Sequence, residues 1–349
     1  MPDPSDLDAL LAAMPAPLDE AGLALAARRL VEACPSPPLP GAGDTLARWR
    51  LLAAVAAHDL PLVKLYEAHA DARAILAELG VRLGVSAPER DSPLMAVWAA
   101  RAPGQELRAS RASRDRSEGD DDGAAVRLTG TKAWCSGAAC VDIALVTCVD
   151  EAGRDRLAAV PMRQPGVTVS TRGWEALGMR TTGSVEVDFA DAAATMVGPA
   201  EAYLRRPGFW HGGAGIAVCW YGAAAALATR LREAAARRDD PHLQAHLGAA
   251  DVALTASRAL LREAAQVIDA DPRTDAMALA LRARAAAEQA AEAVLRAALR
   301  GLGAAPLCRD RWFARMAADL PVFVRQSHAE RDLAALGMAL AKAPGDWRL

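Results

Sequence analysis

A block of strand-forming sequence lies between two alanine-rich, helix-forming regions, and few folds accommodate that order. Between residues 94 and 200, short segments rich in β-branched residues are separated by Gly, Asp and Pro, which favour turns. The segment 185–189 alternates apolar and polar residues strictly, as a half-buried strand does. Strands are expected over residues 126–134, 143–149, 157–160, 167–171 and 185–189. The connections leave no room for crossover helices, so we expect an antiparallel sheet or barrel.

The regions on either side of this block have helical periodicity. Residues 46–57 and 62–79 carry apolar residues at spacings of three and four. After the block, helices are expected over residues 215–238, 242–270, 273–302 and 322–341. Four long helices with short connections favour an antiparallel bundle. The expected fold class is therefore α+β, mostly α, with an N-terminal helical domain, a central antiparallel β-barrel or sandwich domain and a C-terminal four-helix bundle.

Charge and composition exclude several functions. The net charge of −3 among 349 residues offers no basic field to nucleic acid or anionic lipid. Charged residues interrupt the alanine-rich runs well before 18 residues, so no membrane insertion is expected. The six cysteines have no metal-ligand spacing, so we expect reduced thiols in a cytoplasmic protein and no metal site.

One motif, Leu128-Thr-Gly-Thr-Lys-Ala-Trp-Cys-Ser-Gly137, combines an aromatic ring with a hydroxyl. In a strand, residues i and i+2 point to one face, so Trp134 and Ser136 are expected side by side. A flat ring beside a hydroxyl suits a planar heterocycle with ring heteroatoms. The alternative is a core tryptophan next to a serine that caps a loop.

Two further segments contain motifs that could belong to a functional site. Residues 177–189 predict a loop followed by a strand. Residues 320–333 contain a dense polar run, with Arg325, His328, Glu330 and Arg331, that we expect on a helix. The alternative for this run is a solvated face with intrahelical ion pairs.

Together these segments resemble the acyl-CoA dehydrogenase family. Residues 128–137 resemble its L-x-G-x-K-x-W-I-T-N-G segment, and residues 177–189 resemble its L-G-M-R-x-(S/T)-x-(S/T)-x-x-V-x-F segment, in the same order. The sequence of helical, β and helical regions also matches. The resemblance implies three domains, residues 1–90 (a shortened helical domain), 91–203 and 204–349, and a homodimer or homotetramer.

The resemblance further implies an FAD flavoprotein. Trp134 and Ser136 fall on the flavin-contacting Trp and Thr of the family. The family's upstream motif, T-E-x-x-x-G-S-D, corresponds here to residues 97–107, which lack its hydroxyl-bearing residues. In that stretch Trp98, Gly104 and Gln105 are the candidates for contact with the cofactor.

The family's catalytic glutamate is missing from both of its usual places. The first place corresponds to Gln326-Ser327-His328, and the second to residues 211–216. His328, with Ser327 beside it, is our candidate base, because the ordinary pKa of a histidine, about 6.5, suits proton transfer. A surface histidine paired with Glu330 or Asp332 is the alternative.

Three other residues are weaker candidates. Glu67 and His69 are expected to line the cofactor cleft or to form an exposed helical pair. His211, at the entry to the C-terminal helices, is expected to face substrate or to have a structural role.

Three functions stay open at this stage. The first is an FAD-dependent oxidoreductase that oxidises a carbon–hydrogen bond of a small molecule, with an acyl thioester as one candidate, by means of a non-standard base. The second is a monooxygenase or oxidase of the same fold that uses reduced flavin and oxygen. The third is a catalytically degenerate scaffold subunit.

Overall fold

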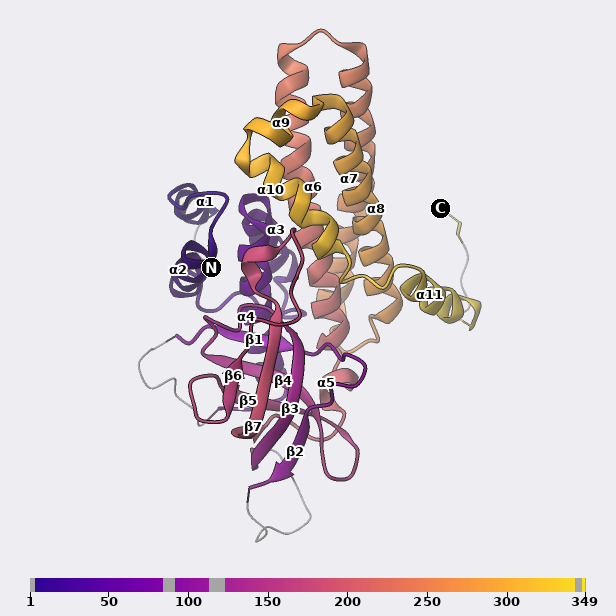
Figure 1. Cartoon of the computed structure of the whole chain (residues 1–349). Helices are drawn as coiled ribbons and strands as arrows, with labels where there is room; N and C mark the ends of the chain where they lie inside the picture. Colours follow the sequence, from indigo (N-terminus) through magenta and orange to yellow (C-terminus); the bar gives the residue numbers. More distant parts are fainter. Residues whose placement is uncertain (1–3, 84–91, 113–122, 343–346, 349) are drawn as a thin grey trace.

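The structure is a computed structural model that describes residues 4–83, 92–112, 123–342 and 347–348. An N-terminal group of helices and a C-terminal group of longer helices stand on a β domain (Figure 1). The first group contains α1 (Pro4–Ala12), α2 (Glu20–Ala33), α3 (Thr45–His58) and α4 (Leu60–Glu78). Of these, α3 and α4 confirm the helices expected over residues 46–57 and 62–79.

A carboxylate marks the junction between α3 and α4. Asp59 is buried and accepts the Leu62 N–H at 2.9 Å, so it caps the first turn of α4. Its second oxygen accepts the Leu18 N–H at 3.1 Å, which joins the segment before α2 to this junction. Pro61 occupies the first turn of α4, where a missing N–H costs nothing.

The β domain closes into a ring of five strands. Its strands are β1 (Met95–Trp98), β2 (Arg108–Arg111), β3 (Ala125–Cys135), β4 (Ile143–Val149), β5 (Asp155–Pro161), β6 (Val167–Val169) and β7 (Val185–Met196), with the 3-10 turn η1 (Arg180–Thr182) before β7. The ring runs β4-β2-β3-β7-β5 and returns to β4, while β1 and β6 extend it from β4 and β7. A barrel-like sheet was expected and is found.

The expectation that every pair is antiparallel is wrong. β1 pairs with β4 in parallel over four residue pairs, and β2 meets β4 in parallel at Arg108 and Val149. A crossover helix is not needed for this arrangement, because the long connection through β2 and β3 returns the chain to β4 in the same direction as β1.

All regular secondary structure among the described C-terminal residues is helical. These helices are α5 (Ala202–Arg205), α6 (Gly208–Arg237), α7 (Pro241–Ala270), α8 (Met277–Leu302), α9 (Ala304–Arg309), α10 (Arg311–Val324) and α11 (Glu330–Lys342). α6 packs against α3, α7, α8 and α10, and α11 packs against α8. Three of the four expected helices correspond to α6, α7 and α8, whereas a regular four-helix bundle stays a prediction.

The helix expected over residues 322–341 is wrong, because the chain breaks between α10 and α11. The backbone of Ala329 has φ of +46°, which an α-helix does not allow. The Gln326 carbonyl, which a continuous helix would use internally, accepts instead from Arg284 Nη2 on α8 at 2.7 Å. The residues of the break therefore form a loop between two helices.

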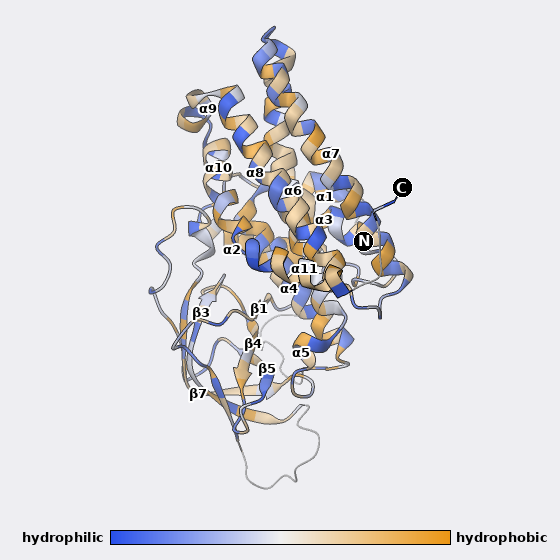
Figure 2. Cartoon of the chain, turned by 90° about the vertical axis from the view of Figure 1, so that its right-hand side faces the viewer, coloured by the Kyte–Doolittle hydropathy of each residue, from blue (hydrophilic) through white to orange (hydrophobic). Residues whose placement is uncertain are grey.

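Apolar packing joins the three parts. Bands of hydrophobic and hydrophilic residues alternate along the helices, as expected of helices that bury one face (Figure 2). One main core extends from α1 to α10, and a smaller cluster lies between α4 and strands β1, β4 and β5. By length and composition α6 alone among the described helices resembles a membrane span, but 67% of its most apolar window is buried inside the protein.

The predicted domain limits remain predictions. The limit between residues 90 and 91 touches residues 84–91, which lie outside the described residues, and the limit between 203 and 204 falls within α5.

Candidate active site

A cavity of about 910 Å³ opens where the three parts of the chain meet. The β domain contributes the ends of β1 and β3, parts of β4 and β5, and the segment before β7. The helices contribute α4, the region from α5 to the start of α6, one turn of α8, and the end of α10 with the loop that follows it. This volume lies within the usual range for small-molecule and cofactor sites. Of the predicted site residues, Trp98, Trp134, Ser136 and His328 line it.

Trp134 stands at an irregularity of β3. The pairing of β3 with β7 shifts register between Lys132 and Cys135, and Trp134 has φ of +56°. The Trp134 side chain is 47% exposed although it is large and apolar. A bulky residue in the left-handed region is strained, and such strain is concentrated at functional sites.

Trp134 and Ser136 line the same cavity, but the alternation of side chains along a regular strand is not the reason. β3 ends at Cys135, and the Ser136 N–H donates back to the Trp134 carbonyl at 3.0 Å in a tight turn. The two side chains therefore share the cavity because of a bulge and a turn, not because they are two apart on a flat strand. Trp98 holds this turn, since its Nε1 donates to the Ser136 carbonyl at 3.1 Å.

Three hydroxyls form a connected file behind Ser136. Ser136 Oγ and Ser184 Oγ are 2.7 Å apart, and Ser184 Oγ and Thr182 Oγ1 are 2.8 Å apart. Thr182 Oγ1 donates to the Met179 carbonyl at 2.7 Å. All three side chains are buried and all three belong to the cavity wall. We call these three residues the hydroxyl file.

α10 fixes the segment that carries the far end of this file. Asp319 accepts the Met179 N–H at 2.5 Å, and Arg315 Nε donates to both Asp319 oxygens at 3.0 and 3.1 Å. Arg315 Nη2 also donates to Thr181 Oγ1 at 2.6 Å. Burial of Asp319 raises the pKa of this carboxyl to about 6. Met179 itself has φ of +57°, so these contacts hold a backbone conformation that is costly by itself.

The loop after α10 brings His328 into the cavity lining. His328 Nδ1 lies 3.2 Å from Asp332 Oδ1, and the His328 N–H donates to Asp332 Oδ2 at 3.2 Å. With Asp332 as a carboxylate, Nδ1 carries the proton of the neutral ring and Nε2 keeps its lone pair. The His328 side chain is 63% exposed. This geometry leaves one basic nitrogen free to meet a ligand.

Ser327 takes part in the loop and not in the cavity wall. It is buried, and its Oγ accepts the Ala329 N–H at 3.2 Å. The structure thus gives Ser327 a local structural contact, while a catalytic role for it stays a prediction.

Of the weaker candidates, only Glu67 lines the cavity. Lys64 Nζ donates to Glu67 Oε1 at 2.5 Å, while burial raises the pKa of Glu67. His69 faces the β domain, where its Nδ1 accepts the Met95 N–H at 3.1 Å and burial lowers its pKa to about 3. His211 is buried outside the lining, and burial lowers its pKa too.

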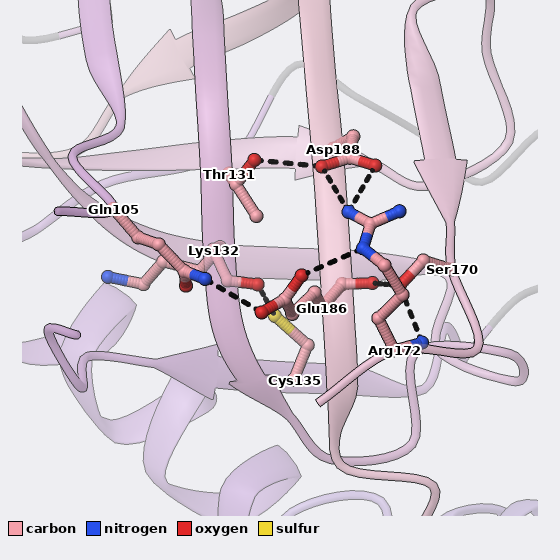
Figure 3. A network of polar contacts seen from close by, with 8 residues as sticks. All are labelled: Gln105, Thr131, Lys132, Cys135, Ser170, Arg172, Glu186 and Asp188. Atoms are coloured by element: carbon pink, nitrogen blue, oxygen red, sulfur yellow. Dashed lines mark hydrogen bonds and ion pairs between the residues drawn. The ribbon is translucent and has the colours of Figure 1, made fainter. Parts of the chain in front are cut away.

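Gly104 and Gln105 lie outside the cavity, on the β3–β7 side of the β domain. Gln105 Nε2 donates to Glu186 Oε1 at 2.7 Å, and Arg172 joins Glu186 to Asp188 in the same network (Figure 3). Gly104 has φ of +75°, and a Cβ there would meet open space. The chain thus uses Gln105 in an ion-pair network, and a cofactor contact at either residue stays a prediction.

Several buried polar atoms of lining residues make no hydrogen bond within the described chain. Trp174 Nε1 and Arg206 Nε are donors, and Gln326 Oε1 and Asp71 Oδ1 are acceptors. Asp71 Oδ1 lies 3.8 Å from Arg206 Nη2 in an ion pair. A buried polar atom without a partner is costly, so such atoms in a cavity point to a ligand with matching groups. Aromatic walls with unmatched donors and acceptors fit a flat heterocycle with a polar edge, such as a flavin ring.

Sequence reasoning missed several of these residues. Thr182 and Ser184 lie in a segment that was predicted only as loop and strand. For Asp319 the one available sign was a carboxylate within an apolar stretch of helix, and the structure shows that it is buried. Trp174 has no motif around it. Their roles depend on contacts between residues that are far apart in the chain.

Comparisons with known proteins agree with this architecture. Residues 104–192 match the family model described as the acyl-CoA dehydrogenase middle domain. Comparison of the sequence with curated proteins gives no match.

Solved structures with the same fold cover nearly the whole chain. Dibenzothiophene monooxygenase (TdsC) from Paenibacillus sp. A11-2 has a TM-score of 0.75 and 16% identity, over 97% of this chain and 96% of that one. Methanesulfinate monooxygenase MsuC from Pseudomonas fluorescens has a TM-score of 0.71 and 18% identity, over 99% of each chain. Butyryl-CoA dehydrogenase from Megasphaera elsdenii has a TM-score of 0.71 and 19% identity, over 86% of this chain and 83% of that one. The chain therefore has the acyl-CoA dehydrogenase-like fold, and its residues 104–192 match the model of the acyl-CoA dehydrogenase middle domain.

Proposed function

We propose that this protein is a flavin-dependent monooxygenase that receives reduced flavin and uses molecular oxygen. The observation that carries the proposal is the shared cavity, whose lining includes Trp134 and Ser136 together with the paired His328 and Asp332. TdsC and MsuC, which are named as monooxygenases and have the same fold over 97% and 99% of this chain, are consistent with the proposal.

The residues of the cavity have distinct tasks in this proposal. Trp134 and the buried Trp174 Nε1 would hold the flavin ring, and Ser136 would bond a ring nitrogen. Reduced flavin supplies two electrons and two protons, so that substrate RH and O₂ give ROH and water while the flavin becomes oxidised. His328 would accept or return a proton through Nε2 while Asp332 keeps the ring in place.

The choice between FMN and FAD is part of the proposal. TdsC has been solved with FMN and indole. In this chain, the segment that corresponds to the family's hydroxyl-rich flavin motif carries Gly104 and Gln105 outside the cavity. We therefore propose FMN, because FAD carries an additional adenosine part for which the protein must also provide a binding site.

Oxygen incorporation tests the function directly. Purified protein would be titrated with FMN and with FAD, and binding would be followed by quenching of flavin fluorescence. A flavin reductase with NADH would then supply reduced flavin under ¹⁸O₂, with indole and dibenzothiophene as probes. We expect one ¹⁸O atom in the product. Absence of binding of either flavin at about 1 mM, far weaker than cofactor affinities, would contradict the proposal.

The base is tested by substitution. His328→Ala should lower the rate of oxygen incorporation by about 10²-fold, with flavin affinity unchanged. His242→Ala, in the exposed first turn of α7, is the matched control and should keep the wild-type rate. Equal rates in the two variants would rule out His328 as the base.

A desaturase is the second candidate, and Glu67 is the observation that favours it. This carboxyl lies on the cavity wall next to Lys64, and burial raises its pKa, as for a base that must take a proton near neutral pH. Desaturation removes two hydrogens from an acyl-CoA and reduces the flavin without a reductase. Anaerobic loss of the oxidised-flavin absorbance on addition of butyryl-CoA would identify this reaction.

A further inference from the structure

We propose that the hydroxyl file makes the Ser136 hydroxyl an acceptor toward the cavity, so that the site binds reduced flavin more tightly than oxidised flavin. This inference rests on the proposed flavin site and concerns its preference between two redox states. Thr182 and Ser184 are positioning residues in this scheme, because they act on the ligand through Ser136.

The direction of the file follows from its last member. A carbonyl oxygen only accepts, so the 2.7 Å contact with the Met179 carbonyl uses the single hydroxyl hydrogen of Thr182. Thr182 then only accepts from Ser184, and Ser184 in turn only accepts from Ser136. Each hydroxyl has one hydrogen, so the hydrogen of Ser136 points away from the ligand.

Because the three side chains are buried, water does not compete for the hydrogen bonds that set the direction of the hydroxyl file. The exposed fraction rises from 2% at Thr182 through 5% at Ser184 to 9% at Ser136, so Ser136 is the end nearest the open cavity. Trp98 Nε1 binds the Ser136 carbonyl and holds the turn. Ser136 Oγ therefore offers lone pairs, and no hydrogen, to a group in the cavity.

Flavin reduction reverses the hydrogen-bonding character of a ring nitrogen. In the oxidised ring the central nitrogens are acceptors, and two acceptors facing each other leave both unmatched. Reduction adds two electrons and two protons, and a ring nitrogen that gains hydrogen becomes a donor for Ser136. The matched state is the reduced one, which suits a protein that takes up flavin already reduced.

The midpoint potential of bound FMN tests the inference, because it reports the ratio of the two affinities. Reduction with dithionite against a reference dye gives the potential, and fluorescence titration gives the affinity for oxidised FMN. Thr182→Val removes the carbonyl-anchored hydroxyl at nearly constant shape, so Ser184 and Ser136 become free to reverse. We expect the preference for reduced FMN to fall about tenfold, which lowers the potential by about 30 mV for a two-electron couple.

Three further variants complete the test. Thr182→Ser keeps the hydroxyl and should keep the wild-type potential. Ser184→Ala interrupts the file at its middle and should lower the potential as Thr182→Val does, which also covers a Thr182→Val protein that does not fold. Thr229→Val removes a hydroxyl that donates to the Ala225 carbonyl on α6, away from the cavity lining, and should leave the potential unchanged.

The outcomes are separable from the proposed function. A fall in potential for Thr182→Val and Ser184→Ala, with Thr182→Ser and Thr229→Val unchanged, supports the inference. An unchanged potential in Thr182→Val or Ser184→Ala, or an equal loss of affinity for both redox states, overturns it while the flavin site stands. Failure of wild-type protein to bind FMN or FAD overturns both.

Discussion

Replacing Lys132 by methionine should abolish a rise in stability that the wild-type protein shows at alkaline pH. The Lys132 side chain is 4% exposed, and its ammonium donates to Thr147 Oγ1 at 2.7 Å and to the Thr147 carbonyl at 3.1 Å. Both of these partners are uncharged. Burial therefore lowers the pKa of Lys132 from 10.5 to about 8.

The sign follows from the protons bound in each state. Between pH 8 and 10.5 the folded protein has released the Lys132 proton while the unfolded chain still holds it. The unfolded state then binds more protons, so the free energy of unfolding rises with pH through this window. At about 1.4 kcal/mol for each pH unit of difference, the rise is about 3 kcal/mol for so deeply buried a group.

Urea unfolding at intervals from pH 7 to 10.5 measures the effect. The quantity to follow is the free energy of unfolding of wild type minus that of Lys132→Met, because groups common to both proteins cancel. Among them are the buried thiols of Cys135 and Cys148, whose pKa values burial raises. The exposed Lys342, replaced by methionine, controls for the loss of one positive charge. A difference that stays constant across the window would show that Lys132 is not desolvated as described.

Two other outcomes depend on packing and on the cavity wall. Trp134→Ala should weaken flavin binding about tenfold with little loss of stability, because the ring is half-exposed and its area faces the cavity; fluorescence titration and thermal unfolding check the two parts. Gly222→Ala should cost about 2 kcal/mol or more in urea unfolding, since a Cβ on α6 would lie 2.3 Å from the Ala53 carbonyl of α3. Gly248→Ala, at an exposed position of α7 with open space around it, should instead gain about 0.5–1 kcal/mol, and destabilisation there would contradict the packing argument.

Local patterns predicted the order of the elements because periodicity reports burial directly. The alternation in residues 185–189 marked β7, and the spacing of apolar residues marked α3, α4, α6, α7 and α8. β1 and β2 were not predicted, because neither sequence alternates regularly between apolar and polar residues: β1 is apolar throughout and β2 has a single apolar residue. Their parallel pairing with β4 is a long-range property that no local pattern contains.

The site was predicted less completely than the fold. Trp134 and Ser136 both line the cavity, but a bulge and a turn bring them there and not the strand periodicity that was expected. His328 was expected on a helix, and it lies in a loop because Arg284 of α8 takes the Gln326 carbonyl. Contacts of this kind join residues 42 positions apart, so the residues around His328 give no sign of them.

One helix positions both halves of the site. The middle of α10 holds the Met179 backbone through Asp319 and so anchors the hydroxyl file, while the end of α10 leads directly into the loop that carries His328. The fit between this helix and the segment before β7 is close, because a Cβ at Gly178 would lie 2.0 Å from the Ala318 carbonyl. The hydroxyl proposed to meet the flavin and the base proposed to meet the substrate are thus both positioned by α10. The packing of α10 relates them in space, although they lie almost 200 residues apart in the sequence.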